Sequence, residues 1–330
     1  MADNKRGKYA ELIDEEVWGF IERSVSCFPT DAAEQSMATQ RALYNAMSQQ
    51  FYAGRPAGVT AQDYEFISTE ANANKLRLRE YQFEGSQSGV EANPQPRAQI
   101  LYFHGGGYVV GDLESHDDVC AEICAHTGLL LTAVDYRLAP EHRYPAAFDD
   151  AFASYHHVLA RNQLPVILMG DSAGANLAVS VAHRIRGQAA QAIGQLLIYP
   201  VLGSDFSQGT YLEHANAPLL STNDMLFYQR QLLNGDAPLD TDLTLPKESW
   251  FAPLDDNDFS GLPPTTVFTA QCDPLAGDGL AYCQRIQAAG GVSHCYEEKG
   301  LVHGYLRARH CATAAKDSFG RILKMIADFC

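Results

Sequence analysis

The sequence has no long apolar segment and few basic residues. No apolar run approaches the roughly 20 residues that a membrane-spanning helix requires, and the chain starts with a polar segment rather than the apolar core of a signal peptide. The 24 lysines and arginines are outnumbered by 40 aspartates and glutamates, which gives a formal net charge of −16. Such a surface repels phosphate backbones and anionic lipid head groups, so nucleic-acid and membrane partners are disfavoured. We therefore expect a soluble, cytoplasmic protein.

The eight cysteines lack the spacing of a disulfide framework, and no CxxC pair is present. His116, Cys120 and Cys124 lie four residues apart and would share one face of a helix. The outer two would then be about 12 Å apart along the helix axis, whereas zinc bonds are roughly 2.0–2.3 Å long. We therefore expect free thiols, no metal and no cofactor.

Short apolar strands alternate with helices along most of the chain, and 46% of the residues are hydrophobic. Strands are expected at 76–83, 98–103, 129–134, 166–169, 193–199, 265–270 and 292–297, with helices at 145–160, 173–186, 277–289 and 313–329. The alternation of polar and apolar residues at 76–83 predicts an outer strand. Continuously apolar strands followed by helices are typical of an α/β fold with a mostly parallel sheet that helices cover on both faces.

Two stretches interrupt this alternation. The first 55 residues show helical spacing of apolar residues, and more than sixty residues separate Pro200 from the strand that begins at Thr265. A structureless connection of that length is improbable in a compact domain, and a helical pattern at 223–233 follows the candidate cap Ser221. We therefore divide the chain into N-terminal cap helices (1–55), a core in two parts (56–202 and 252–330) and a cap insertion (203–251).

The segment Gly170-Asp171-Ser172-Ala173-Gly174 has the form Gly-x-Ser-x-Gly between an expected strand and an expected helix. A strand that turns directly into a helix holds the serine in a strained conformation, so Gly170 and Gly174 must be small. The turn lifts the serine hydroxyl above the edge of the sheet, where the helix N-terminus favours developing negative charge. Ser172 is thus the candidate nucleophile, with Asp171 in a structural role beside it.

A glycine-rich loop, His104-Gly105-Gly106-Gly107, follows the expected strand at 98–103. Acyl transfer needs donors for a developing oxyanion, and backbone N–H groups can serve where no side chain blocks them. Gly106, Gly107 and Ala173 are the preferred donors, and Gly105 is included in the same oxyanion hole. His104 is interpreted as structural.

A serine nucleophile also needs a base and an orienting carboxylate. Among the five histidines downstream of Ser172, only His303 lies in a loop just after an expected strand, where functional groups collect in α/β sheets. Asp273 follows the preceding strand, and the 30 residues between them accommodate one helix and one strand. Asp278 is the alternative acid, although an acidic residue there also suits a helix start. The other candidate bases are His183, His214, His294 and His310.

Together these segments resemble the hormone-sensitive-lipase branch of the α/β-hydrolases, which includes bacterial family IV carboxylesterases with a helical cap. The matching pieces are the runs at 104–112, 135–142, 170–174, 197–200, 273–275 and 303–304, in the order of that family. The resemblance implies Ser172, Asp273 and His303 as the catalytic triad, small esters with short to medium acyl chains as substrates, and frequent homodimers. The chain departs from the family at Ala276-Gly277-Asp278, where an Arg-Asp pair is common.

The sequence leaves two other functions open. The same triad could serve an amidase or deacetylase, because the shape of the pocket selects the leaving group. Some relatives of this fold are small-molecule receptors that do not hydrolyse their ligand. Those tend to lose the histidine, and His303 is present here. The residues therefore favour a serine carboxylesterase.

Overall fold

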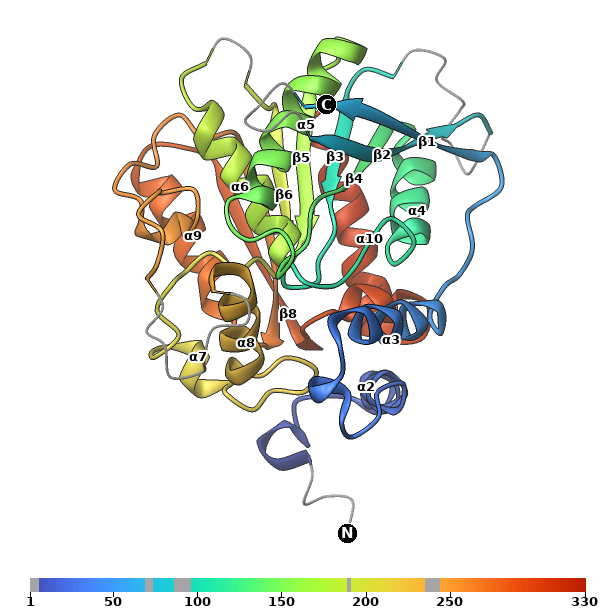
Figure 1. Ribbon diagram of the computed structural model, residues 1–330, viewed down its shortest axis with the longest axis vertical. Helices are drawn as coiled ribbons and strands as arrows, with labels where there is room; N and C mark the ends of the chain where they lie inside the picture. Colours follow the sequence, from blue (N-terminus) through green and yellow to red (C-terminus); the bar gives the residue numbers. More distant parts are fainter. Residues whose placement is uncertain (1–5, 69–73, 86–95, 189–190, 235–243) are drawn as a thin grey trace.

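The computed structural model describes residues 6–68, 74–85, 96–188, 191–234 and 244–330, and within them a sheet of eight strands forms the centre (Figure 1). The strand order is β1-β2-β4-β3-β5-β6-β7-β8. β2 runs antiparallel to both of its neighbours, β1 and β4, and the pairs from β4 to β8 are parallel. The strands are β1 (Val59–Ile67), β2 (Lys75–Phe83), β3 (Gln99–Phe103), β4 (Leu130–Asp135), β5 (Val166–Asp171), β6 (Gly194–Ile198), β7 (Thr265–Cys272) and β8 (Ser293–Val302).

Helices cover both faces of the sheet, each over its own apolar core. One core contains α5 (Ala146–Asn162), α6 (Ala173–Ile185) and α9 (Ala276–Ala288), and the other contains α4 (Asp117–Thr127) and α10 (Thr313–Ala327). Every residue of β3 and β6 is buried, as expected for strands with helices on both sides. The predicted α/β-hydrolase fold class is therefore confirmed.

The edge of the sheet differs from the prediction. The edge strand is β1, which was not predicted, and β2, which was predicted as an outer strand, lies between β1 and β4. No residue of β1 is fully buried, because one side of this edge strand faces solvent. Its sequence therefore carries only a weak apolar pattern, which does not predict a strand.

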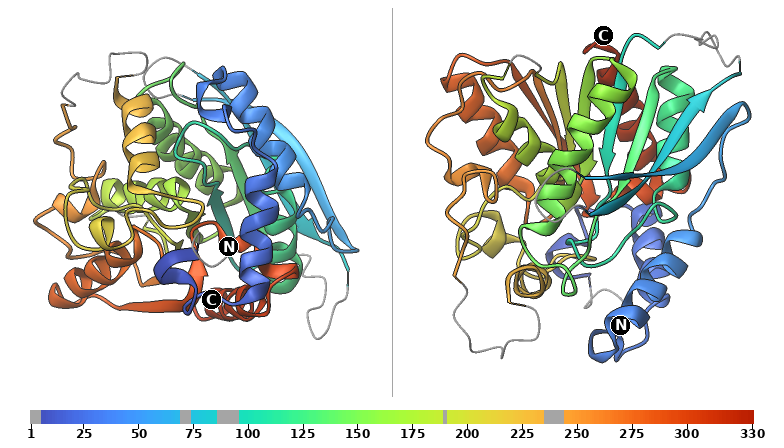
Figure 2. Two further views of the ribbon diagram at one scale, coloured as in Figure 1. Left: turned by 90° about the horizontal axis from the view of Figure 1, so that it is seen from below. Right: turned by 45° about the horizontal axis from the view of Figure 1, so that its top comes forward.

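The N-terminal and inserted helices lie together beyond the carboxyl ends of the parallel strands, α2 and α3 on one side and α7 and α8 on the other (Figures 1 and 2). The predicted helix in the insertion is present as α8, and Ser221 caps it in a capping box with Asp224. Among the described residues, no helix is both long and apolar enough to cross a membrane. The remaining helices are α2 (Glu15–Ser26), α3 (Met37–Gln49), α7 (Thr210–Glu213) and α8 (Thr222–Leu233), with short 3-10 helices η1 (Gly7–Tyr9), η2 (Ala32–Glu34), η3 (Pro253–Asp255) and η4 (Tyr305–His310).

His183 is a buried histidine of α6 that contacts side chains from two other segments of the chain. Its Nδ1 lies 2.9 Å from Asp256 Oδ2, and its Nε2 lies 3.1 Å from the Tyr282 hydroxyl. Burial lowers the pKa of His183 to about 4, despite the opposing effect of Asp256. The folded protein therefore keeps this ring neutral at pH values where an unfolded chain protonates it.

This burial predicts an acid-sensitive fold. Because the unfolded chain takes up a proton near pH 6.5 and the folded chain only near pH 4, the contribution of His183 is complete above pH 6.5 and is lost as the pH falls toward 4, by up to about 3 kcal/mol. Urea unfolding between pH 7 and pH 4 measures this decline. It should be less steep in His183→Gln and unchanged in the control His294→Gln, whose side chain is exposed on β8. An equal decline in wild type and His183→Gln would contradict the assignment.

Candidate active site

Ser172 lies at a sharp turn between β5 and α6. Its φ of 54° and ψ of −123° are a strained combination for a residue with a side chain. A Cβ added at Gly174 would lie 2.0 Å from the Phe103 carbonyl oxygen, and one added at Gly170 would lie 2.5 Å from the Gly174 carbonyl carbon. The turn therefore admits only glycine at these two positions, which explains the Gly-x-Ser-x-Gly pattern.

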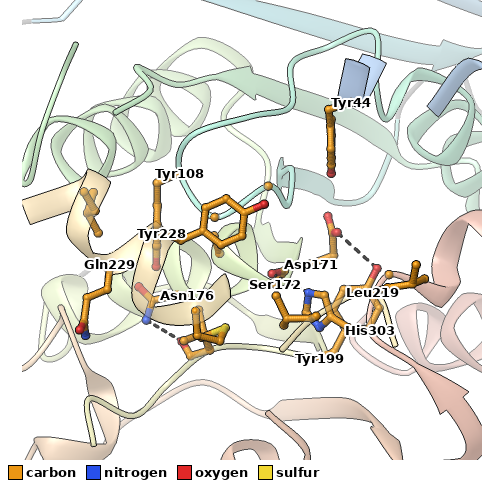
Figure 3. Close-up of a pocket in the computed structure, with 18 of the residues that line it drawn as sticks. Tyr44, Tyr108, Asp171, Ser172, Asn176, Tyr199, Leu219, Tyr228, Gln229 and His303 are labelled. Carbon is orange, nitrogen blue, oxygen red and sulfur yellow. Dashed lines mark hydrogen bonds between the residues drawn. The ribbon is translucent and has the colours of Figure 1, made fainter. Parts of the chain in front are cut away.

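The structure brings Ser172, His303 and Asp273 together. His303 Nε2 lies 3.0 Å from Ser172 Oγ, and His303 Nδ1 lies 2.7 Å from Asp273 Oδ2. Asp273 is fully buried, and its second oxygen accepts a hydrogen bond from the Leu275 N–H at 2.9 Å. The three residues follow β5, β7 and β8, whose carboxyl ends meet at one edge because these strands are parallel. Figure 3 shows Ser172 beside the His303 ring.

Asp278, the alternative acid, has a different set of partners. Its Oδ2 accepts hydrogen bonds from the backbone N–H groups of Leu202 and Gly203, at 2.7 and 2.9 Å, and from the Tyr211 hydroxyl at 2.7 Å. Burial raises its pKa to about 6. Asp278 thus ties α9 to the beginning of the insertion and does not contact His303, so Asp273 is the carboxylate partner of the histidine.

The glycine-rich loop passes close to Ser172. A Cβ at Gly106, where φ is 130°, would lie 2.0 Å from the Val110 carbonyl oxygen, and a Cβ at Gly107, where φ is 60°, would lie 2.4 Å from the Tyr228 ring. No acceptor is present for the N–H of Gly106 or Gly107 among the described residues. Ala173 is the first residue of α6, where an N–H has no intrahelical acceptor. These three predicted donors are therefore available to a bound group.

The prediction that Gly105 belongs to the oxyanion hole is wrong. Its N–H donates to Asp171 Oδ1 at 2.8 Å and is therefore not free for an oxyanion. A Cβ at Gly105 would also lie 2.4 Å from Asp171 Oδ2, so glycine is required for packing against the carboxylate. His104, beside it, stacks on the Tyr136 ring with 4.3 Å between centroids, and its carbonyl accepts a hydrogen bond from the Tyr136 hydroxyl at 2.7 Å. Burial and the nearby His116 lower the pKa of His104 to about 4.

Asp171 is buried at the centre of a hydrogen-bond cluster beneath the nucleophile. It also accepts hydrogen bonds from Tyr102 at 2.9 Å and Tyr199 at 3.3 Å, and His116 Nε2 lies 3.3 Å away. Burial alone would raise the pKa of Asp171, but His116, the Arg307 charge and the Tyr102 hydroxyl hold it below its usual range. The cluster fixes the loop and the nucleophile turn relative to each other.

Tyr199 is a site residue that the sequence analysis missed. Its ring lies 4.6 Å from that of His303, between the histidine and Asp171. The only signal for it was its position after β6 at the same edge of the sheet, within the run at 197–200. Neither its contact with His303 nor its bond to Asp171 follows from that position alone.

A pocket of about 210 Å³ opens at Ser172. The N-terminal helices contribute Phe20, Tyr44 and Met47 to its wall, and the insertion contributes several apolar side chains and Gln229. In Figure 3, Gln229 lies to the left of Ser172, whereas Tyr44 lies above it and to its right. The lining from the insertion comprises Gly203, Phe206, Leu219, Leu220, Met225, Tyr228, Gln229, Leu232 and Phe251.

Comparisons with known proteins agree with this geometry. A family model described as the alpha/beta hydrolase fold matches residues 100–307. The chain belongs to this family. Esterase LipI of Mycobacterium tuberculosis is 35% identical over 235 residues, which cover 67% of this chain and 70% of that protein. Carboxylic ester hydrolase LipN of the same organism is 32% identical over 285 residues, which cover 82% and 69% of the two chains.

Two further comparisons concern a solved structure and a relative with a named substrate. The structure of a hyperthermophilic esterase from the archaeon Pyrobaculum calidifontis superposes with a TM-score of 0.80 at 25% identity, over 96% of this chain and 98% of that one. A protein of Pseudomonas putida named ethyl acetate hydrolase is 32% identical over 218 residues, 64% of this chain and 66% of its own. The predicted resemblance to hormone-sensitive-lipase-like carboxylesterases is confirmed, and with it the predicted enzyme class, a carboxylic ester hydrolase.

Proposed function

We propose that this α/β-hydrolase cleaves short- to medium-chain carboxylic esters through an acyl-enzyme on Ser172. The observation that carries the proposal is the chain of contacts from Ser172 Oγ through His303 to Asp273, at 3.0 and 2.7 Å. These are hydrogen-bond distances for a hydroxyl, an imidazole and a carboxylate. A serine hydroxyl needs such a base to become nucleophilic at neutral pH.

The reaction begins when Ser172 Oγ attacks the ester carbonyl and His303 Nε2 takes the hydroxyl proton. The N–H groups of Gly106, Gly107 and Ala173 stabilise the oxyanion of the tetrahedral intermediate. His303 then returns the proton to the departing alcohol, which leaves the acyl group on Ser172. A water molecule, deprotonated by His303, attacks the acyl-enzyme and releases the acid. Throughout, Asp273 orients the imidazole and stabilises its charge.

The proposed substrate range rests on the pocket. Segments 1–55 and 203–251 act in this proposal as a cap, and their side chains enclose a volume of about 210 Å³ around Ser172. Most of the wall is apolar, which suits an acyl chain, while its limited volume restricts the length of that chain. The name of the Pseudomonas relative, ethyl acetate hydrolase, is consistent with a small ester.

A series of ester substrates tests the proposal. The value of kcat/KM should peak at short to medium acyl length when nitrophenyl esters from acetate to laurate are compared, because longer chains exceed the pocket. Matched acyl anilides should be cleaved far more slowly. A maximum at laurate would indicate a lipase, faster cleavage of the anilides would indicate an amidase, and no turnover of any ester would point to a receptor. Each of these three results contradicts the proposal.

A further inference from the structure

Arg307 lines the same pocket as Ser172, four residues after His303 in η4. Its side chain is half-buried, and its guanidinium donates to the Tyr44 hydroxyl at 2.7 Å and to Ser48 Oγ at 3.3 Å, both on α3. Its Cζ also lies 4.9 Å from the centre of the Tyr44 ring. The third nitrogen, Nη1, makes no hydrogen bond among the described residues, although a guanidinium carries five donors.

No carboxylate of the described residues lies within ion-pair distance of the Arg307 guanidinium, whose hydrogen bonds go to two hydroxyls. The two arginines whose side chains are buried, Arg79 and Arg309, do form ion pairs. Arg309, two residues further along, lies 2.6 Å from both Asp118 and Glu122. Arg79 lies 2.5 Å from Asp63 and also pairs with two other carboxylates. Within the described segments, the half-buried Arg307 lines the pocket with no carboxylate in contact and a free Nη1, so it is suited to receive a negative group from outside the chain.

Asp171 and Arg307 favour each other's charged form electrostatically, but no hydrogen bond joins them, so the guanidinium keeps donors for another group. The Asp171 oxygens already accept hydrogen bonds from Gly105, Tyr102 and Tyr199. The two neutral hydroxyl partners of Arg307 orient its planar group without cancelling its charge. Such a guanidinium matches a carboxylate, which can accept two parallel N–H donors.

From this arrangement we infer that Arg307 binds a carboxylate carried by the substrate, so that the preferred esters are anionic. The inference rests on the proposed esterase function and specifies the substrate class. The position of Arg307 also indicates which half of the ester carries the carboxylate. Arg307 donates to the Tyr44 hydroxyl, and in Figure 3 Tyr44 and His303 both lie to the right of Ser172, away from Gln229. Because His303 gives its proton to the departing alcohol, the carboxylate is expected on the alcohol half of the ester.

The experiment compares charged and neutral esters of similar size, with acid release followed in a pH-stat. One pair places the charge on the alcohol half, O-butyrylglycolate against propyl butyrate. The other pair places it on the acyl half, monoethyl succinate against ethyl butyrate. For each pair, the ratio of kcat/KM for the charged ester to that for the neutral ester is measured in wild type and variants. The ratio does not depend on how much of a preparation is folded, because both esters meet the same enzyme.

In Arg307→Met the ratio should fall by about 10- to 100-fold in the alcohol pair, the range expected for a lost charge-assisted hydrogen bond. Arg307→Lys should retain part of it. The control Arg143→Met removes the same charge from an exposed position and should leave the ratio unchanged. A fall confined to the acyl pair would support the carboxylate site and reverse its direction.

Two results would overturn the inference. One is a ratio that stays within about twofold of wild type in both pairs, which would mean that Arg307 only fastens η4 to α3. The other is a wild-type enzyme that hydrolyses the neutral esters but neither charged one. Failure of wild type on all four esters would instead overturn the proposed function, and this inference with it.

Discussion

Replacing Ser172 with alanine should lower kcat for ester hydrolysis by about three to six orders of magnitude, the range seen when a triad nucleophile is removed. The hydroxyl that lies 3.0 Å from His303 Nε2 would be absent, so no acyl-enzyme could form. Steady-state hydrolysis of nitrophenyl butyrate measures the loss. A fluorophosphonate probe should label wild type at Ser172 and leave the variant unlabelled.

Ser180 provides a matched control, because it lies in the same helix α6 and is fully buried. Its Oγ has no hydrogen-bond partner in the part of the chain that the structure describes. Ser180→Ala should therefore keep wild-type kcat and full labelling. Activity of Ser172→Ala near the wild-type level would refute the assignment of the nucleophile. Full activity without probe labelling of wild type would point to a different kind of hydrolase.

Gly174→Ala should have the second largest effect. The added Cβ would lie 2.0 Å from the Phe103 carbonyl oxygen and 2.4 Å from that of His104, and neither backbone atom can move without shifting the glycine-rich loop. A displacement of about 1 Å between catalytic groups can cost about 100-fold in rate, and overpacking of this kind typically costs about 1–3 kcal/mol of stability. Both kcat/KM and the free energy of unfolding in urea should therefore fall.

The control for this substitution is Gly320→Ala. Gly320 is exposed in α10, and a Cβ there would meet no atom within 4 Å. Because alanine favours a helix by about 1 kcal/mol over glycine, this variant should be slightly more stable than wild type and fully active. A Gly174→Ala enzyme with unchanged activity and stability would show that the loop adapts more readily than the carbonyl positions indicate.

The positions of the triad residues could be predicted because each of them directly follows a strand in the parallel part of the sheet. Ser172, Asp273 and His303 follow strands that run in parallel, so their positions along the chain already place them at one edge of the sheet. The glycines on either side of Ser172 are needed because the strand-to-helix turn leaves no room for a side chain, and this local pattern can be recognised from the sequence. The choice between Asp273 and Asp278 rested on similar local reasoning and agrees with the contacts of His303.

The features that were missed depend on contacts between distant segments. Gly105 has the same local sequence context as Gly106, and only the approach of Asp171 takes its N–H out of the predicted oxyanion hole. The outer strand β1 was missed because an edge strand with one solvent face has little apolar pattern. The partners of Arg307 are more than 250 residues away along the chain, so nothing near it in the sequence distinguishes it from a surface arginine.

The sequence by itself determined the kind of chemistry, because strained turns, glycine loops and strand ends are local features that particular residue types require. Only the tertiary structure decided which N–H groups remain free, which aromatic ring lies beside His303, and which guanidinium in the pocket has no carboxylate in contact. These depend on how the N-terminal helices and the insertion pack over the carboxyl ends of the strands. Residues that look equivalent in the sequence therefore differ in the structure, because their burial and hydrogen bonds depend on contacts between these distant segments.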